Sequence, residues 1–244
     1  MAGLIETGFR SSHGIVPALD AETLDEIKRV VAATTRIEGV VAYKLGLTAV
    51  LRIGLAQAVR ALRSVTDLPI IYDHQKAGPD VPDMAAKFTS ICREAGVDGL
   101  ILFPVAGPRA VREFAGNALR SGLLPIVGGD LPLPDYNVAG GGYVADDALP
   151  RIISAAVDLG VDHFVVPAND PARVETIAAD LVARLDRPPG LLLPGIGALG
   201  GSIGATFAAA AGCRLYAVVG RAIYKAPDPA QAARGLAEEA LAFA

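Results

Sequence analysis

The sequence predicts an α/β protein that folds as one (β/α)8 TIM barrel, and three observations carry this prediction. Short, nearly continuous apolar segments alternate with longer Ala-rich amphipathic segments along the chain, as expected for parallel strands that are covered on both faces. Eight such pairs occur in 244 residues, and a barrel of this kind has about 250 residues. No linker separates two halves, so residues 1–244 are expected to form a single domain.

The expected strands are short aliphatic or β-branched runs. They are Gly14–Leu19, Val40–Leu45, Pro69–Tyr72, Gly99–Phe103, Leu124–Val127, His163–Val166, Gly190–Leu193 and Leu215–Val219. The expected helices are the amphipathic segments between them. They are Ala21–Thr34, Ala49–Arg63, Val81–Ala95, Pro108–Arg120, Asp146–Leu159, Pro171–Arg184, Ser202–Ala211 and Asp228–Phe243. The alternative, an open doubly wound sheet, would have fewer strands and a glycine-rich fingerprint after the first one, where this chain has Leu19-Asp20.

Boundary residues support the expected helix ends. Asp170-Pro171 and Asp228-Pro229 each place a capping carboxylate before a proline at the first helical position, where the missing N–H removes no hydrogen bond. Glycines just past four helices can adopt the left-handed conformation that closes a helix. They are Gly96, Gly122, Gly160 and Gly212. The longest irregular stretch, Gly128–Ala145, is expected to be a lid or binding loop, because loops of this length are uncommon in compact domains.

Composition excludes several classes of protein. The chain has 22 Lys and Arg against 26 Asp and Glu, a net charge of −4, which disfavours a duplex-binding face. It has no Trp and only 5% aromatic residues, which disfavours a stacking platform for single-stranded nucleic acid. Cys92 and Cys213 lie far apart, so neither a disulfide framework nor a thiolate metal site is expected. Without a membrane-spanning run or a signal peptide, we expect a cytoplasmic protein with no nucleic-acid or membrane partner.

Charged residues cluster where the first three strands end, and catalytic side chains of this barrel project from that end. Asp20 follows the first strand, Lys44 lies near the end of the second, and Asp73 follows the third, with Lys76 and Asp80 in the next loop. Taken singly, Asp20 could cap the next helix, and Asp73 could form a surface pair with Lys76. Lys44, however, lies in an apolar strand and must be paired there. We therefore interpret the group as one site.

Alternating carboxylates and ammonium groups suit carbanion chemistry. Each lysine between carboxylates stays protonated, and each carboxylate beside a lysine stays ionised, even when water is excluded. Such fixed charges can stabilise a developing carbanion and then protonate it. A substrate carboxylate held beside an enzyme carboxylate is repelled, and loss of carbon dioxide relieves that repulsion.

A second group of residues is typical of anion binding. Loops after the seventh and eighth strands form the common phosphate site of these barrels. Glycines let the backbone approach an anion, and an arginine donates a forked pair of hydrogen bonds. The candidate substrate-binding residues there are Pro194, Gly195, Gly197, Gly200, Gly201, Gly220 and Arg221. The glycines could alternatively serve only as tight turns.

Together these motifs resemble the orotidine 5′-phosphate decarboxylase family, over nearly the whole chain. The matching segments are Ala18-Leu19-Asp20, Lys44, the Asp73/Lys76/Asp80 group followed by Val81-Pro82, Pro194–Gly197, Val219–Tyr224 and Pro227–Pro229. The resemblance implies decarboxylation of orotidine monophosphate to uridine monophosphate in pyrimidine biosynthesis, with no cofactor and no metal. The implied small-molecule partner is therefore a nucleoside monophosphate.

The resemblance also implies a role for each charged residue. Lys76 would protonate the pyrimidine carbon that loses carbon dioxide, and Asp73 would lie against the departing carboxylate. Lys44 would anchor the charge network and the ribose, and Asp20 would bind a ribose hydroxyl. Active sites of the family lie at a homodimer interface, where Asp80 would reach in from the partner. The phosphate would be held by Gly220 and Arg221.

The chain departs from the family pattern at several positions. Both gaps in the Asp-Lys-Asp motif are one residue longer than usual. Met84 stands where a hydroxyl residue is common, and Leu199 stands where the family commonly has a Gln that bridges pyrimidine and phosphate. The loop after the fifth strand, which should contact the base, has no obvious Ser. Substrate clamping is therefore expected to differ.

Two alternative functions remain. Magnesium-dependent 3-keto-gulonate-6-phosphate decarboxylases and hexulose-phosphate synthases share the Asp/Lys/Asp pattern but carry a metal-ligating Glu after the second strand, where this chain has Leu45-Gly46-Leu47. A non-catalytic nucleotide- or phosphate-binding barrel is the other alternative, although a pure binder would not need adjacent desolvated charges. His163 is expected to pack at a strand start, and His74 borders the site as a weaker candidate for substrate contact.

Overall fold

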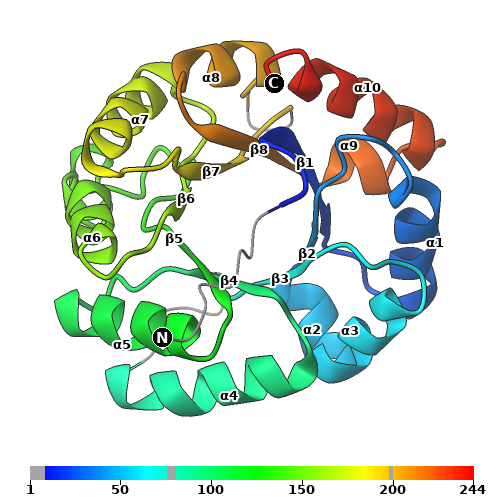
Figure 1. Ribbon diagram of the computed structural model, residues 1–244, viewed down its shortest axis with the longest axis horizontal. Coiled ribbons are helices and arrows are strands. Elements are labelled where there is room, and N and C mark those ends of the chain that lie inside the picture. Colours follow the sequence, from blue (N-terminus) through cyan, green and yellow to red (C-terminus); the bar gives the residue numbers. More distant parts are fainter. Residues whose placement is uncertain (1–8, 76–80, 198–199) are drawn as a thin grey trace.

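The computed structural model describes residues 9–75, 81–197 and 200–244. In this part of the chain, eight parallel strands close into a barrel in sequence order, with helices in a ring outside it (Figure 1). The predicted (β/α)8 barrel is confirmed. The strands are β1 (His13–Leu19), β2 (Tyr43–Leu45), β3 (Ile70–Asp73), β4 (Gly99–Leu102), β5 (Leu124–Val127), β6 (His163–Val165), β7 (Gly190–Pro194) and β8 (Arg214–Val219).

The helices connect successive strands and cover the outer face of the barrel (Figure 1). The α-helices are α1 (Leu24–Thr34), α2 (Leu47–Ile53), α3 (Leu55–Arg63), α4 (Ala85–Ala95), α5 (Pro108–Arg120), α6 (Ala148–Val157), α7 (Pro171–Arg184), α8 (Ile203–Ala209), α9 (Arg221–Tyr224) and α10 (Pro229–Leu241). The 3-10 turns that lie wholly in the described ranges include η2 (Pro82–Met84) and η3 (Val138–Gly140). Within the described ranges, no helix combines the length and the apolarity that crossing a membrane requires.

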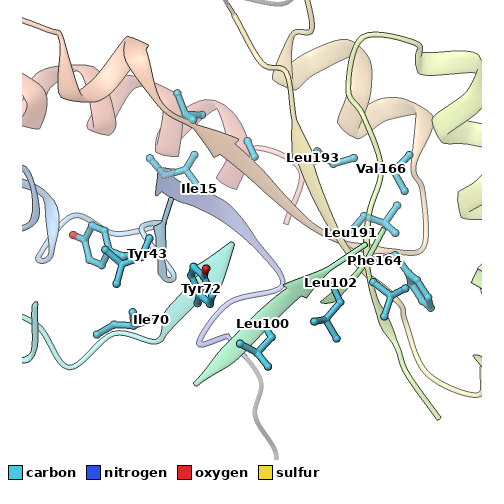
Figure 2. Close-up of a cluster of buried hydrophobic side chains, with 14 of the residues drawn as sticks. Ile15, Tyr43, Ile70, Tyr72, Leu100, Leu102, Phe164, Val166, Leu191 and Leu193 are labelled. Carbon is cyan, nitrogen blue, oxygen red and sulfur yellow. The ribbon is translucent and has the colours of Figure 1, made fainter. Parts of the chain in front are cut away.

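Strand side chains separate into two hydrophobic clusters because successive residues of a strand point to opposite faces. One set, which includes Ile15, Tyr43, Leu100 and Phe164, packs between the barrel and its helices (Figure 2). The intervening set fills the barrel interior and includes Val16, Ile71, Ile101, Leu124, Ile126, Val165, Leu192, Tyr216 and Val218. Burying such a side chain contributes about 1.5–3 kcal/mol. Both faces are therefore apolar, which explains the nearly continuous apolar runs in the sequence.

The two aspartate caps predicted at helix starts are confirmed, whereas α6 and α8 end at Val157 and Ala209, before the glycines predicted to close them. Asp170 accepts a hydrogen bond from the Arg173 N–H, and Asp228 accepts from the N–H groups of Ala230 and Gln231. The glycines predicted to close helices all have a positive φ, between 70° and 87°. They are Gly96, Gly122, Gly160 and Gly212. These ends are local properties of the chain, so the sequence could predict them.

Other boundaries differ from the predictions. The single helix predicted over Ala49–Arg63 is wrong, because Gly54 (φ +84°) ends α2 and begins a separate helix, α3. The strand predicted from Val40 begins only at Tyr43, and Val40 forms an isolated bridge with Ile15. The helix predicted from Val81 starts with the 3-10 turn η2 before α4, and the short helix α9 was not predicted.

The N-terminal end of the barrel is closed by aromatic side chains around His163, at the start of β6. Its Nδ1 donates to Asp162 Oδ1 at 2.7 Å, and the ring is packed edge-on against Phe9. Arg187 and Arg214 also pair with Asp162, at 2.7 and 3.1 Å. Burial lowers the pKa of His163 below its ordinary value of 6.5, although the hydrogen bond and charge of Asp162 oppose this shift. The prediction that His163 packs at a strand start is confirmed.

We predict that the neutral, buried His163 makes stability fall in mild acid. Below pH 6.5 the unfolded chain gains a proton that the folded chain resists, so the free energy of unfolding decreases as pH falls toward the lower, folded pKa. The loss approaches at most about 1.4 kcal/mol per pH unit. Urea unfolding between pH 7.5 and 5.5 measures it, and His163→Gln should flatten the slope.

The matched control is His13→Gln, because burial lowers the pKa of His13 as well. His13 lies half-buried at the start of β1, so its variant should change the slope less than His163→Gln does. A His163→Gln variant that keeps the parental slope would contradict the prediction.

Candidate active site

Three charged side chains meet inside the C-terminal end of the barrel. In the strand register, Ala18 pairs with Lys44, and Lys44 pairs with Ile71. Ala18 and Ile71 belong to the cluster that fills the barrel interior. Asp20 and Asp73 each follow one of these positions by two residues, which returns their side chains to the interior side. The long Lys44 side chain therefore extends from one layer of the barrel up to two carboxylates in the next.

The observed distances match this arrangement. Lys44 Nζ donates to Asp73 Oδ2 at 2.7 Å and lies 3.5 Å from Asp20 Oδ1. The side chains of Lys44 and Asp73 are 5% and 1% exposed, whereas Asp20 is 27% exposed and can meet a ligand. Burial alone would lower the pKa of Lys44, but the charges and hydrogen bonds of Asp73 and Asp20 outweigh it and raise that pKa. Lys44 is therefore a fixed positive charge.

Gly46 leaves the space that Asp20 occupies. A Cβ atom at Gly46 would lie 1.7 Å from Asp20 Oδ1, closer than any real contact allows. The backbone of Gly46 is extended, with φ −84°, so close approach rather than conformation requires a glycine here. The alternative prediction that Asp20 caps the following helix is wrong: Thr23 is the cap of α1 and forms a capping box with Glu26.

Two buried acceptors lie next to these charges. Asp73 Oδ1 and Gln75 Oε1 accept no hydrogen bond from any residue in the described ranges. Both residues line the same cavity. A buried acceptor without a donor is unfavourable by about 1–3 kcal/mol. The two oxygen atoms are therefore available to hydrogen-bond donors at the cavity, and nothing in the sequence had marked Gln75 as a site residue.

A cavity of about 390 Å³ connects the charged residues with the predicted anion-binding residues. It is lined by Ala18, Asp20, Lys44, Asp73, Gln75, Ile101, Asp130, Leu131, Pro132, Leu133, Val165, Pro194, Gly195, Ile196, Val218, Gly220, Arg221, Ala222 and Tyr224. Arg221 is exposed and pairs with no acidic group among the residues described, so its guanidinium is available to an anion. The arrangement can hold a small molecule with an anionic group at one end and a reacting carboxylate at the other.

The candidate glycines of the phosphate side divide into two sets. Gly195 and Gly220 line the cavity, together with Pro194. The other three use their N–H groups inside the β7–α8 loop: Gly197 donates to Gly201, Gly200 to Gly197, and Gly201 to Gly195. Gly197, Gly200 and Gly201 are absent from the described lining of the cavity. Their geometry is that of tight turns, the alternative that the sequence had left open.

Several predicted residues lie elsewhere or outside the description. Lys76 and Asp80 fall in residues 76–80, and Leu199 falls in 198–199, all outside the described residues. His74 is not among the described lining residues; its ring packs on Phe88 at 4.4 Å between centroids. The prediction that the Gly128–Ala145 segment contributes to binding agrees with the Leu131–Leu133 turn, which borders the cavity.

The residues that the structure describes contain no cluster of side chains that could form a metal site. In the described ranges, no three His, Cys, Asp or Glu side chains come together as metal ligands. The carboxylates of Asp20 and Asp73 both pair with Lys44. Asp130 is the residue that sequence reasoning missed most clearly, since no motif marked it and only the path of the chain brings it to the cavity.

Comparisons with known proteins agree with this geometry. Orotidine 5′-phosphate decarboxylase of Methanosarcina barkeri is 30% identical over 225 residues, which cover 92% of this chain and 93% of the relative. The enzyme of the same name from Thermococcus kodakarensis is 31% identical over 183 residues, 75% of this chain and 77% of the relative. The crystal structure of orotidine 5′-monophosphate decarboxylase from Methanocaldococcus jannaschii, complexed with inhibitor BMP, shares the fold. Its TM-score is 0.78 at 23% identity, covering 93% of this chain and 98% of that one.

A sequence model of one family covers nearly the whole barrel. The match spans residues 14–236, from the first strand to the last helix. The chain therefore belongs to the orotidine 5′-phosphate decarboxylase / HUMPS family.

Proposed function

We propose that this chain is a carboxy-lyase that converts orotidine 5′-phosphate to uridine 5′-phosphate without a cofactor. The observation that carries the proposal is the buried Asp20–Lys44–Asp73 array at the same cavity as Arg221. The family and the relatives named above support the same reaction. The product would serve pyrimidine nucleotide synthesis.

In this mechanism the bond between the pyrimidine ring and its carboxyl carbon breaks, and its electron pair stays on the ring carbon. Asp73 faces the departing carboxylate and destabilises it by repulsion, which loss of carbon dioxide relieves. Lys76 donates its proton to the ring carbon and closes the cycle as a neutral amine that regains a proton from solvent. Lys44 Nζ lies 2.7 Å from Asp73 Oδ2 and compensates the negative charge of this buried carboxylate.

The remaining residues hold the nucleotide. Asp20, the most exposed member of the array, accepts from a ribose hydroxyl beside Lys44. Arg221 pairs with the phosphate, and Gly220 and Gly195 let the backbone approach it. Binding energy from these remote groups positions the carboxylate against Asp73, which is how non-reacting parts of a substrate accelerate a reaction.

The proposal also covers the oligomeric state and the cellular location of the enzyme. Residues 1–244 would form one domain, and two copies would form a cytoplasmic homodimer in which Asp80 completes the partner's site. A partner carboxylate would extend the alternating array and keep Lys76 protonated. Isologous dimers of this kind place two equivalent sites at one interface.

The magnesium-dependent reaction of the same family is the alternative to be tested. A metal-ligating carboxylate at the end of β2 would have to replace Leu45, Gly46 or Leu47. Gly46 cannot be replaced without displacing Asp20, since its Cβ would lie 1.7 Å from that carboxylate. This close approach favours the proposed reaction.

We predict that the parent protein decarboxylates orotidine 5′-phosphate in the presence of a metal chelator. Loss of absorbance by the substrate measures the rate. Lys76→Ala should lower kcat by at least about 10²–10⁴-fold, because it removes the proton donor. Lys87→Ala, at an exposed position of α4, is the matched control and should keep the parental rate. A parent without this activity, or one that requires magnesium, would contradict the proposal.

Shared active sites predict subunit complementation. Lys76→Ala and Asp80→Lys should each be nearly inactive as a pure variant. In a mixed dimer, the intact Lys76 of one subunit meets the intact Asp80 of the other, so one functional site is regained. Mixing differently tagged variants, isolating the mixed dimer and assaying it tests this expectation. Mixed dimers that stay inactive would argue against shared sites.

Gly46→Ala tests whether the geometry of the charge array is needed for catalysis. The added methyl group displaces the Asp20 carboxylate from Lys44, so kcat/KM for orotidine 5′-phosphate should fall about tenfold or more. Gly235→Ala in α10 adds the same group where no atom lies within 4 Å, and it should leave kcat/KM unchanged. Equal kinetics for the two variants would refute the role assigned to this contact.

A further inference from the structure

Asp130 is a buried carboxylate at the cavity that the charge array does not include. It follows β5 in step with Leu124 and Ile126, whose side chains fill the barrel interior. Only 3% of Asp130 is exposed, and the residue lines the same cavity as Lys44. A carboxylate that has lost its hydration to this extent needs hydrogen-bond donors around it.

Two donors in the described part of the chain reach Asp130. Arg173, in the first turn of α7, places Nη2 2.6 Å from Oδ2, and the Leu131 N–H donates to Oδ1 at 2.9 Å. Burial nevertheless raises the pKa of Asp130, even though Arg173 and the Leu131 N–H both act to lower it. Desolvation therefore exceeds what these partners return, and a further donor from the cavity would stabilise the ionised carboxylate.

Two glycines hold this segment against the barrel. A Cβ atom at Gly128 would lie 2.5 Å from the Phe103 ring, and one at Gly129 would lie 2.6 Å from Ile152 Cδ1. A larger residue at Gly128 would require the Phe103 ring or the chain to move, and one at Gly129 would require the end of the Ile152 side chain to move. The sequence Gly128-Gly129-Asp130 thus carries the carboxylate to the cavity on a closely packed backbone.

The position of Asp130 away from the array matches the chemistry of the pyrimidine. In a closed ring of eight strands, β5 lies across the barrel from β1, which precedes Asp20, and two strands from β3, which carries Asp73. In the orotidine ring, the carbon that carries the carboxyl group lies across from the N–H between the two carbonyl groups. The cavity wall between the two sides includes the apolar Ile101 and Val165, which suit the faces of a flat ring.

We propose that Asp130 accepts a hydrogen bond from this ring N–H and thereby selects a substrate with an imide edge. The inference rests on the proposed function, because it assumes that the reacting carbon lies over the array. Arg173 acts through Asp130 as a positioning residue: it fixes the carboxylate and keeps it ionised. Asp130 would therefore supply base recognition in the strand-5 loop that lacks a serine.

The test compares binding of uridine 5′-phosphate with binding of its derivative methylated at the ring N–H. The parent should bind the unmethylated nucleotide about 10–100-fold more tightly, the range expected for a hydrogen bond to a charged group. Asp130→Ala removes the acceptor and leaves room for the methyl group, so the ratio of the two Kd values should approach one. A purely structural role would weaken both ligands equally and leave the ratio unchanged.

Controls keep the outcome clear. Asp135→Ala removes the same charge from an exposed position of the same loop and should leave both Kd values unchanged. Asp130→Asn keeps the shape and should weaken uridine 5′-phosphate binding about tenfold by removing the charge. An unchanged ratio in an Asp130 variant that still decarboxylates orotidine 5′-phosphate overturns this inference alone. A parent that neither binds the product nor decarboxylates the substrate overturns the proposed function as well.

Arg173→Gln tests the positioning role. Without the guanidinium, the pKa of Asp130 should rise further. As the pH is lowered, product binding by the variant should therefore begin to weaken at a higher pH than product binding by the parent. Identical pH profiles of Kd for the variant and the parent would contradict the role given to Arg173.

Discussion

The pairing of Lys44 with Asp73 and Asp20 constrains the rest of the site. These charges lie at one end of a barrel interior that is filled mainly by apolar side chains, so each must be compensated by a neighbour. The same low polarity that makes an isolated charge unfavourable strengthens the interactions among paired ones. A rigid array of this kind needs no reorganisation when charge develops on a bound ligand. The structure thus concentrates its polar interactions where chemistry is proposed.

Closure of the sheet provides that rigidity. Alternation along each strand separates a helix-covered cluster from an interior cluster, and the charges continue the interior set at the C-terminal end. Close contacts at two glycines then position the carboxylates. Gly46 leaves space for the Asp20 side chain, and Gly128 lets the chain that leads to Asp130 pack against Phe103. At the opposite end, Asp162 and His163 form a buried polar pair that contributes to stability and lies away from the cavity. The two ends therefore serve different purposes.

Sequence motifs indicated the charge array and the candidate anion-binding residues, whereas no motif indicated the cavity wall at β5. Gln75 and Asp130 both line the cavity, and no motif had indicated either. The β7–α8 glycines, by contrast, were recognised as a motif but use their N–H groups within the loop. A family motif thus locates the chemistry, while the contacts of each loop determine which atoms are available to a ligand.

The sequence by itself determined the order of the eight strands, the two aspartate-capped helix starts, and the interior charges Asp20, Lys44 and Asp73. These follow from periodicity and local hydrogen bonding, which neighbouring residues specify. The Thr23–Glu26 capping box is also local, although the sequence prediction overlooked it. Only the tertiary structure decided that Gln75 and Asp130 line the cavity. Asp130 reaches it through contacts between segments far apart in the chain, such as Gly128 against Phe103, which no local pattern encodes.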